Sequence, residues 1–246
     1  VKPYVHLRGS GPNATVILST RSQASIGPDS ATMQLENNAR ISDLTVRNEG
    51  VSATFAIALY ASDPTGRAAV IDNVVAEANG TGGVGHYAIY LNDAEPTIRH
   101  SVLRASGANS GTPVNAALGA VNIEGGFPQS LIENSHFEGK GSNSGYGFHL
   151  SSAAPTVRYS YIWGDFRGIA ALAAGVTQVQ NSHLQEGGFS DGALFETTGS
   201  GTVMVATSGV FYINKFTGTG NLVCIHAYKA NYTAATNGTT AATACN

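Results

Sequence analysis

A short strand-like pattern of apolar and polar residues returns seven times along the chain, at intervals of 22 to 34 residues. Each copy is six residues long and begins and ends on an apolar residue. The copies are ISDLTV from Ile41, VIDNVV from Val70, IRHSVL from Ile98, IENSHF from Ile132, VRYSYI from Val157, VQNSHL from Val179 and VATSGV from Val205. The β-branched and aromatic content of these copies suits strands on a pleated, stacked surface.

A first strand with period-2 alternation, which predicts one buried face, precedes most copies: AIAL at 56–59, AIYL at 88–91, AVNI at 120–123 and GFHL at 147–150. Prolines recur between the two strands, at Pro64, Pro96, Pro128 and Pro155, where they can shape a bend without removing a donor from a sheet. Such a repeated strand pair predicts a solenoid, because each unit buries its apolar face only against its neighbours. Leucine-rich repeats would need fixed spacing and a helical stripe, and a β-sandwich would not explain the recurring motif.

The pattern of strand, turn, I-x-N-S-x-L and glycine-rich loop resembles the right-handed parallel β-helix repeats of the pectate-lyase-like superfamily. The opening segment VKPYVHLRGSGPNATVIL resembles the early coil of such proteins, and the resemblance covers roughly residues 1–213. It implies an all-β, single-domain right-handed parallel β-helix of roughly 7–9 coils with a C-terminal cap. Residues 1–220 are expected to form the solenoid, and residues 221–246 a last strand and a capping tail. The resemblance identifies a fold and not an active site, since the superfamily includes enzymes on acidic polysaccharides, surface-binding proteins and proteins without known activity.

Equivalent residues of a solenoid stack about 4.8 Å apart along its axis, so columns of the alignment predict surfaces. Two inward columns of the first strand are expected, Ile57, Ile89, Val121, Phe148 and Leu59, Leu91, Ile123, Leu150. The second strand predicts two more, which begin at Ile41 and Val46 and include Val70 and Val75. The turn column is expected to be Asp43, Asp72, His100, Asn134, Tyr159, Asn181 and Thr207, a polar ladder that satisfies backbone groups of adjacent coils.

The column of Val102, His136, Tyr161 and His183 raises the question of a metal ion. Zinc requires nitrogen ligands about 2.0 to 2.1 Å away, usually together with carboxylate or thiolate ligands. Two histidines separated by a coil do not meet that requirement. We therefore predict an exposed aromatic and imidazole strip, with no metal and no cofactor.

The outward residues of the first strand are the predicted glycan-binding site. Tyrosine, asparagine, histidine and carboxylate side chains on a flat sheet can stack on sugar rings and hydrogen-bond their hydroxyls. The predicted residues are Tyr60, Tyr90, Asn92, Asn122, Glu124 and His149, with Tyr90, Asn122 and His149 in one column.

Catalysis on a polysaccharide would need paired carboxyl groups or a base near positive charge. The weak candidates are Asp93, Glu124 and His149, and no Lys or Arg falls in their columns. The catalytic motifs of polygalacturonases, calcium-dependent pectate lyases and pectinesterases are absent from the sequence. In the segment WGDFRG, Asp165 and Arg167 predict a local ion pair or turn.

Amino-acid composition limits the expected partners and the cellular location of the protein. Charged residues make up 12% of the chain and the net charge is −3, without a block of either sign, so neither nucleic acid nor an anionic membrane surface is an expected partner. No apolar run is long enough to insert into a membrane as a helix. Cys224 and Cys245 are the only cysteines, and they predict either a disulfide that staples the tail or two free thiols. Low lysine content and this late pair favour an extracellular or cell-surface location.

We therefore expect a non-catalytic extracellular scaffold or recognition protein that presents a polar sheet to a glycan or to neighbouring subunits. The alternatives are a polysaccharide lyase or glycoside hydrolase, and a self-associating fibre or surface-layer subunit, because a solenoid ends in unpaired strand edges. The tail is expected to fold over the last coil, with Tyr228 and Tyr232 covering apolar edge residues. The competing prediction is a disordered tail with two reduced thiols.

Overall fold

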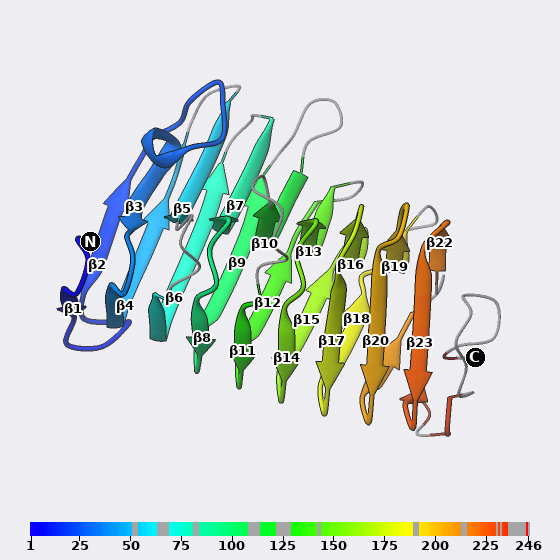
Figure 1. The fold of residues 1–246 in the computed structure, drawn as a ribbon. Helices are drawn as coiled ribbons and strands as arrows, with labels where there is room; N and C mark the ends of the chain where they lie inside the picture. The colour runs from blue at the N-terminus through cyan, green and yellow to red at the C-terminus, as the bar shows by residue number, and fades with distance from the viewer. Residues whose placement is uncertain are drawn as a thin grey trace.

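The computed structural model describes residues 1–50, 54–62, 69–80, 84–107, 114–121, 129–141, 144–188, 192–212, 216–229, 231, 233–235 and 245. Strands of successive coils stack side by side along one axis, from the N-terminus at one end of the molecule to the C-terminus at the other (Figure 1). Every pair between named strands is parallel, from β1 with β4 to β21 with β24. The fold is the right-handed parallel β-helix expected from the repeat.

The first sheet has eight strands in the order of the coils. They are β3 (Ala31–Leu35), β5 (Phe55–Ser62), β7 (Gly85–Asn92), β10 (Val114–Val121), β13 (Gly145–Ser151), β16 (Arg167–Leu172), β19 (Ala193–Thr197) and β22 (Phe216–Gly218). A single turn of 3₁₀-helix, η1 (Pro28–Ser30), precedes β3. Eight coils in the described residues agree with the expected number.

The second sheet has sixteen strands and is bent into two arms. β1 (His6–Arg8) and β2 (Val16–Ser19) pair with the long strand β4 (Arg40–Asn48), which pairs with β6 (Val70–Gly80). From β6 onward the first arm contains β8 (Thr97–Arg99), β11 (Leu131–Glu133), β14 (Thr156–Arg158), β17 (Val176–Gln180), β20 (Thr202–Ala206) and β23 (Asn221–Ile225). The second arm contains β9 (Val102–Gly107), β12 (His136–Gly139), β15 (Tyr161–Gly164), β18 (His183–Glu186), β21 (Gly209–Phe211) and β24 (Tyr228–Lys229).

The main core lies inside the coils and is built from stacked inward columns. Phe137 of the second arm meets Phe148 of the first sheet edge to face, with ring centroids 4.9 Å apart, and both rings are fully buried. Ile132 and Leu184 are fully buried in the same cluster. Each such side chain contributes about 1.5–3 kcal/mol when it leaves water, which explains why the alternating pattern tolerates such different loops.

Strand register corrects two predicted columns of the core. Ile71, and not Val70, pairs with Ile41 and Ile98, so the copy that begins at Val70 is displaced by one residue. Leu118 pairs with both Ile89 and Phe148, so Val121 does not belong to that inward column, and Ile123 lies outside the described residues. The inward positions of β10 are Leu118 and Ala120, and alanine gave the sequence pattern too weak a hydrophobic signal.

The two predicted first-strand columns differ from the structure at β5 as well. Leu59 pairs with Ile89, while Ile57 pairs with Tyr87. Ile57 is fully buried, but it packs with Tyr60 and Tyr87 in a second apolar cluster on the other face of the sheet. AIAL (56–59) was aligned with AIYL (88–91) because the two segments are similar. In the structure the pairing is shifted by two residues from that alignment.

The two ends of the solenoid differ. In the first coil Leu7 is 37% exposed and Leu18 55% exposed. At the other end Tyr228 forms an antiparallel bridge with Ala234, so the described part of the tail folds back on β24. Tyr228 remains 38% exposed, and Tyr232 lies outside the described residues.

A disulfide joins Cys224 of β23 to Cys245, with Cα atoms 5.4 Å apart. The Tyr212 hydroxyl donates a hydrogen bond to the Cys245 carbonyl oxygen at 2.8 Å. β23 and β24 continue the two arms, and the division at residue 220 stays a prediction. No helix among the described residues is long and apolar enough to cross a membrane.

Candidate functional site

The bend between the two arms repeats the same backbone conformation in every coil. The residue at the centre of each bend has a positive φ, and the eight bend residues are Asp43, Asn73, His100, Asn134, Tyr159, Asn181, Thr207 and His226. Asn73 therefore takes the place predicted for Asp72, whose partner in the register is Arg99. Asparagine and aspartate tolerate this left-handed region best, which explains their recurrence in the motif.

Serines one residue after the bend hold adjacent coils together. The Ser160 backbone N–H donates to Ser182 Oγ at 3.1 Å, and Ser182 Oγ donates to the Gln180 carbonyl oxygen at 2.7 Å. The same arrangement recurs between neighbouring coils at Ser101, Ser135 and Ser208. Five of the seven copies of the motif have a serine at their fourth position. The ladder was instead predicted at the third position, which is the bend residue itself.

An open groove of about 630 Å³ runs over this bend and crosses four successive coils. One rim carries the bend residues, the other rim carries the first outward residues of the second arm, and serines lie between them. The lining residues are His100, Ser101, Val102, Asn134, Ser135, His136, Tyr159, Ser160, Tyr161, Asn181, Ser182, His183 and Tyr228.

The second rim is a stack of rings. His136, Tyr161 and His183 lie on paired positions of β12, β15 and β18, and their ring centroids are 4.7 and 4.9 Å apart. Phe211 continues the stack at 4.1 Å from His183, over Gly209, which has no side chain to block it. The predicted aromatic and imidazole strip is present, and its ring faces cover one another, so its edges face the groove.

The groove is nearly uncharged at neutral pH, since none of its described lining residues is Asp, Glu, Lys or Arg. Burial lowers the pKa of His136, and Arg104 and Lys140 lower it further while Glu138 opposes them. Burial also lowers the pKa of His183, against a hydrogen bond with Gln185 that raises it. Both imidazoles are therefore mainly neutral at pH 7.

The stack does not offer a metal site. Ring nitrogens bind a metal through lone pairs in the plane of the ring, and the planes of neighbouring rings are nearly parallel, at 23° and 21°. Lone pairs of His136 and His183 therefore do not converge. Within the described ranges no group of three His, Cys, Asp or Glu side chains is placed to hold a metal ion.

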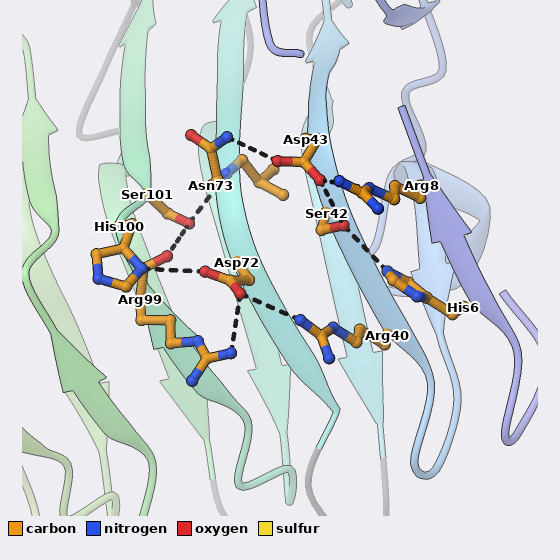
Figure 2. Close-up of polar contacts among 11 residues, drawn as sticks. His6, Arg8, Arg40, Ser42, Asp43, Asp72, Asn73, Arg99, His100 and Ser101 are labelled. Atoms are coloured by element: carbon orange, nitrogen blue, oxygen red, sulfur yellow. Dashed lines mark hydrogen bonds and ion pairs between the residues drawn. The ribbon is translucent and has the colours of Figure 1, made fainter. Parts of the chain in front are cut away.

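Farther toward the N-terminus, the bend carries a network of charged groups (Figure 2). Asp72 accepts hydrogen bonds from Arg40 at 3.2 Å, Arg99 at 2.9 Å and His100 at 3.1 Å. Burial alone would raise the pKa of Asp72, but His100 and Arg99 lower it below its ordinary value. Asp72 thus holds side chains from three coils together.

A serine, a histidine and an aspartate also meet in this network without forming a catalytic triad. Ser42 Oγ lies 3.0 Å from His6 Nε2 and donates to Asp43 Oδ2 at 3.0 Å (Figure 2). In a triad the histidine stands between the serine and the carboxylate. Here the serine stands between them and is only 4% exposed, so the arrangement is structural.

The predicted glycan-binding residues of the first sheet form a packed layer of side chains. Tyr60 and Tyr90 stack with ring centroids 6.2 Å apart, and Asn92 donates to the Tyr60 hydroxyl at 3.2 Å. Tyr60 is only 6% exposed. Most of its ring is therefore covered by protein.

The register differs from the predicted column on this face. Gly119, and not Asn122, pairs with both Tyr90 and His149. A side chain at Gly119 would meet the ring of Tyr87 at 2.5 Å, so the glycine makes room for that ring. Asn122 and Glu124 lie outside the described residues.

The other two predicted catalytic residues lie in different columns. His149 is in β13, and burial lowers its pKa to about 4. Asp93 follows β7, three positions beyond Tyr90, and its backbone N–H donates to the Val121 carbonyl oxygen at 3.0 Å. Because His149 is paired with the column of Tyr90, the register does not bring Asp93 and His149 to one position.

Sequence reasoning missed a charged cluster on the same face. Arg167, only 8% exposed, donates to Glu196 at 3.0 Å and lies 3.7 Å over the ring of Phe166. Tyr146 contacts Phe166 and His149 edge to face. Asp165 and Arg167 were expected to form a local ion pair or turn. The chain bends at Asp165 and Phe166, Arg167 pairs with Glu196, and Asp165 accepts a hydrogen bond from the Gly141 backbone at 2.9 Å. The ion pair joins neighbouring coils, so spacing in the sequence gave no signal for it.

Comparison with known proteins adds one structural likeness. No family model matches the chain, and no curated protein matches it significantly. Among solved structures, the chain is similar to pectin methylesterase PemA from Erwinia chrysanthemi, with 12% sequence identity and a TM-score of 0.43. The match covers 94% of this chain and 76% of that chain.

Proposed function

We propose that the protein is an extracellular, non-catalytic recognition protein that binds a glycan chain in the groove over the bend. The observation that carries this proposal is the groove itself, which is open and repeats its hydrogen-bonding side chains coil by coil. Hydroxyl, amide and imidazole groups can donate to and accept from sugar hydroxyls. A disulfide near the C-terminus supports an extracellular location.

The groove fits binding better than bond cleavage. Glycosidases need two carboxyl groups, one of them an acid with a raised pKa. The described lining residues include no carboxylate, and the imidazoles of His136 and His183 are stacked against neighbouring rings. These groups can hold a chain of sugars but supply no acid and base pair across a glycosidic bond.

The test is a screen of soluble neutral and uronic-acid polysaccharides by affinity electrophoresis and calorimetry. The same samples are assayed for reducing ends and for absorbance of unsaturated products. We expect saturable binding to a polysaccharide without product. The double variant Asn134→Ala, Asn181→Ala should lose binding, while Asn221→Ala, an exposed residue of β23 outside the groove, should retain it. Turnover abolished by changing His149 or Glu124 would overturn the proposal.

A polysaccharide-cleaving activity is the second candidate, and the cluster around Arg167 favours it. Arg167 and Glu196 supply opposite charges beside Tyr146, and desolvation and the nearby Glu196 carboxylate raise the pKa of that tyrosine. A positive charge held beside a potential acid or base is an arrangement that cleavage of an acidic polysaccharide uses. Product formation that is lost in Arg167→Lys or Glu196→Gln, with the fold intact by circular dichroism, would establish this candidate.

A further inference from the structure

Tyr159 occupies a backbone position that does not favour tyrosine. Its φ is +50°, in the bend column where the neighbouring coils have Asn134 and Asn181. A bulky side chain in the left-handed region costs free energy that asparagine largely avoids. Such strain persists where the surrounding structure enforces it, and it concentrates at functional positions.

Packing inside the protein does not repay this cost. Tyr159 is 59% exposed, so most of its surface remains in water. In the described part of the chain no other aromatic ring stacks on it, whereas Tyr161 across the groove is covered by His136 and His183. Tyr159 therefore offers a ring face that the opposite rim lacks.

The position of this ring defines the kind of ligand. It lies on the first rim between Asn134 and Asn181, whose amides can bind hydroxyl groups, and the groove has no charged lining residue. The repeat along the groove is about 4.8 Å, the spacing of strands in a sheet. A sugar ring with its glycosidic linkage has a similar length in an extended chain.

We infer that Tyr159 is the stacking platform for one sugar ring of an uncharged glycan that lies parallel to the axis of the β-helix. This inference rests on the proposed function. One sugar lies over each coil, the ring over Tyr159 is held by its apolar face, and the sugars on either side hydrogen-bond to Asn134 and Asn181. Tyr161 and the two histidines present ring edges to hydroxyls on the other side of the chain.

Tyr159→Asn separates binding from folding. Asparagine suits the backbone here, so the variant should unfold at a higher temperature than the unchanged protein. The probes are a mixed-linkage glucan, a galactomannan and pullulan, with polygalacturonate as the charged comparison. Loss of the aromatic face should weaken binding of the preferred neutral glycan by about threefold to tenfold. Tyr159→Phe keeps the ring and should retain the affinity.

Thr207→Asn is the matched control. Thr207 has φ +49° in the same column but does not line the groove, so this variant should gain stability and keep its affinity. A Tyr159→Asn protein that binds the neutral glycan as tightly as the unchanged protein overturns the inference. Binding of polygalacturonate alone at neutral pH also overturns it and leaves the proposed function standing. Binding of none of a full polysaccharide panel overturns both.

Discussion

The backbone N–H of Ser160 donates a hydrogen bond to Oγ of Ser182, one coil farther along, at 3.1 Å. The Ser182 hydroxyl in turn donates a hydrogen bond to the Gln180 carbonyl oxygen at 2.7 Å. Ser182 is 5% exposed, so its hydroxyl has little contact with water. Each serine of the ladder thus satisfies one buried donor and one buried acceptor at the bend.

Ser182→Ala should therefore lower the free energy of unfolding by about 1–3 kcal/mol, since a buried N–H loses its acceptor. The measurement is urea unfolding followed by circular dichroism. Ser200→Ala is the control, because Ser200 is exposed. Equal stability of the two variants would show that the ladder does not stabilise the bend.

The disulfide between Cys224 and Cys245 should make the last coil depend on redox conditions. Cys224 is 1% exposed and Cys245 is fully buried, and their sequence separation is 21. Closing a loop of this size contributes about 3 kcal/mol in the chain-entropy account. We expect no reactive thiol in the denatured, unreduced protein and a lower melting temperature after reduction. Two reactive thiols would contradict the bridge, and an unchanged melting temperature would contradict its stabilising role.

The sequence predicted the solenoid because its strongest signals are local. Ile132, Val157 and Val179 each begin a six-residue copy of the motif, and they pair as expected in β11, β14 and β17. The fold class and the ring strip followed from such copies. Copies with a weaker pattern were misplaced. The inward residue of one copy is Ile71 and not Val70, an offset of one residue. In the alanine-rich β10 the inward residue is Leu118 and not Val121, because alanines gave a weaker hydrophobic signal than the valine.

The groove was not predictable in the same way. Sequence columns show which residues share a surface, but they do not show that Tyr60 is covered by its neighbours while Tyr159 stands in water at the bend. The pair of Arg167 and Glu196 depends on loop lengths between coils, which the repeat does not determine. The site therefore emerged from burial and register, which require the folded chain.

His149 should make stability depend on pH. Burial lowers its pKa from 6.5 to about 4, so the folded state binds fewer protons than the unfolded state between these values. Stability from this group is complete above about pH 6.5 and is lost as the pH falls toward 4. The full difference is about 3 kcal/mol. Unfolding free energies of the unchanged protein and His149→Asn, measured from pH 7 to pH 4, should converge as the pH falls. Parallel curves would contradict the buried, neutral state of this imidazole.

Acid should change the charge of the groove and with it the preferred glycan. The pKa values of His136 and His183 lie below 6.5, so both rings gain charge only as the pH falls below that value. Glu138, Arg104 and Lys140 are the charged groups that interact with His136. Each new positive charge attracts a carboxylate that remains ionised at pH 5.

Affinity for polygalacturonate should therefore be higher at pH 5 than at pH 7 at low ionic strength, and added salt should reduce the difference. Affinity for the neutral glycan should change little, because hydroxyl groups carry no charge. Calorimetric titrations at the two pH values, with the double variant His136→Asn, His183→Asn as the control, measure both effects. A rise that persists in the double variant would show that the stacked imidazoles are not its source, since His100 also lines the groove. A flat response of the unchanged protein would contradict the predicted role of the stacked imidazoles.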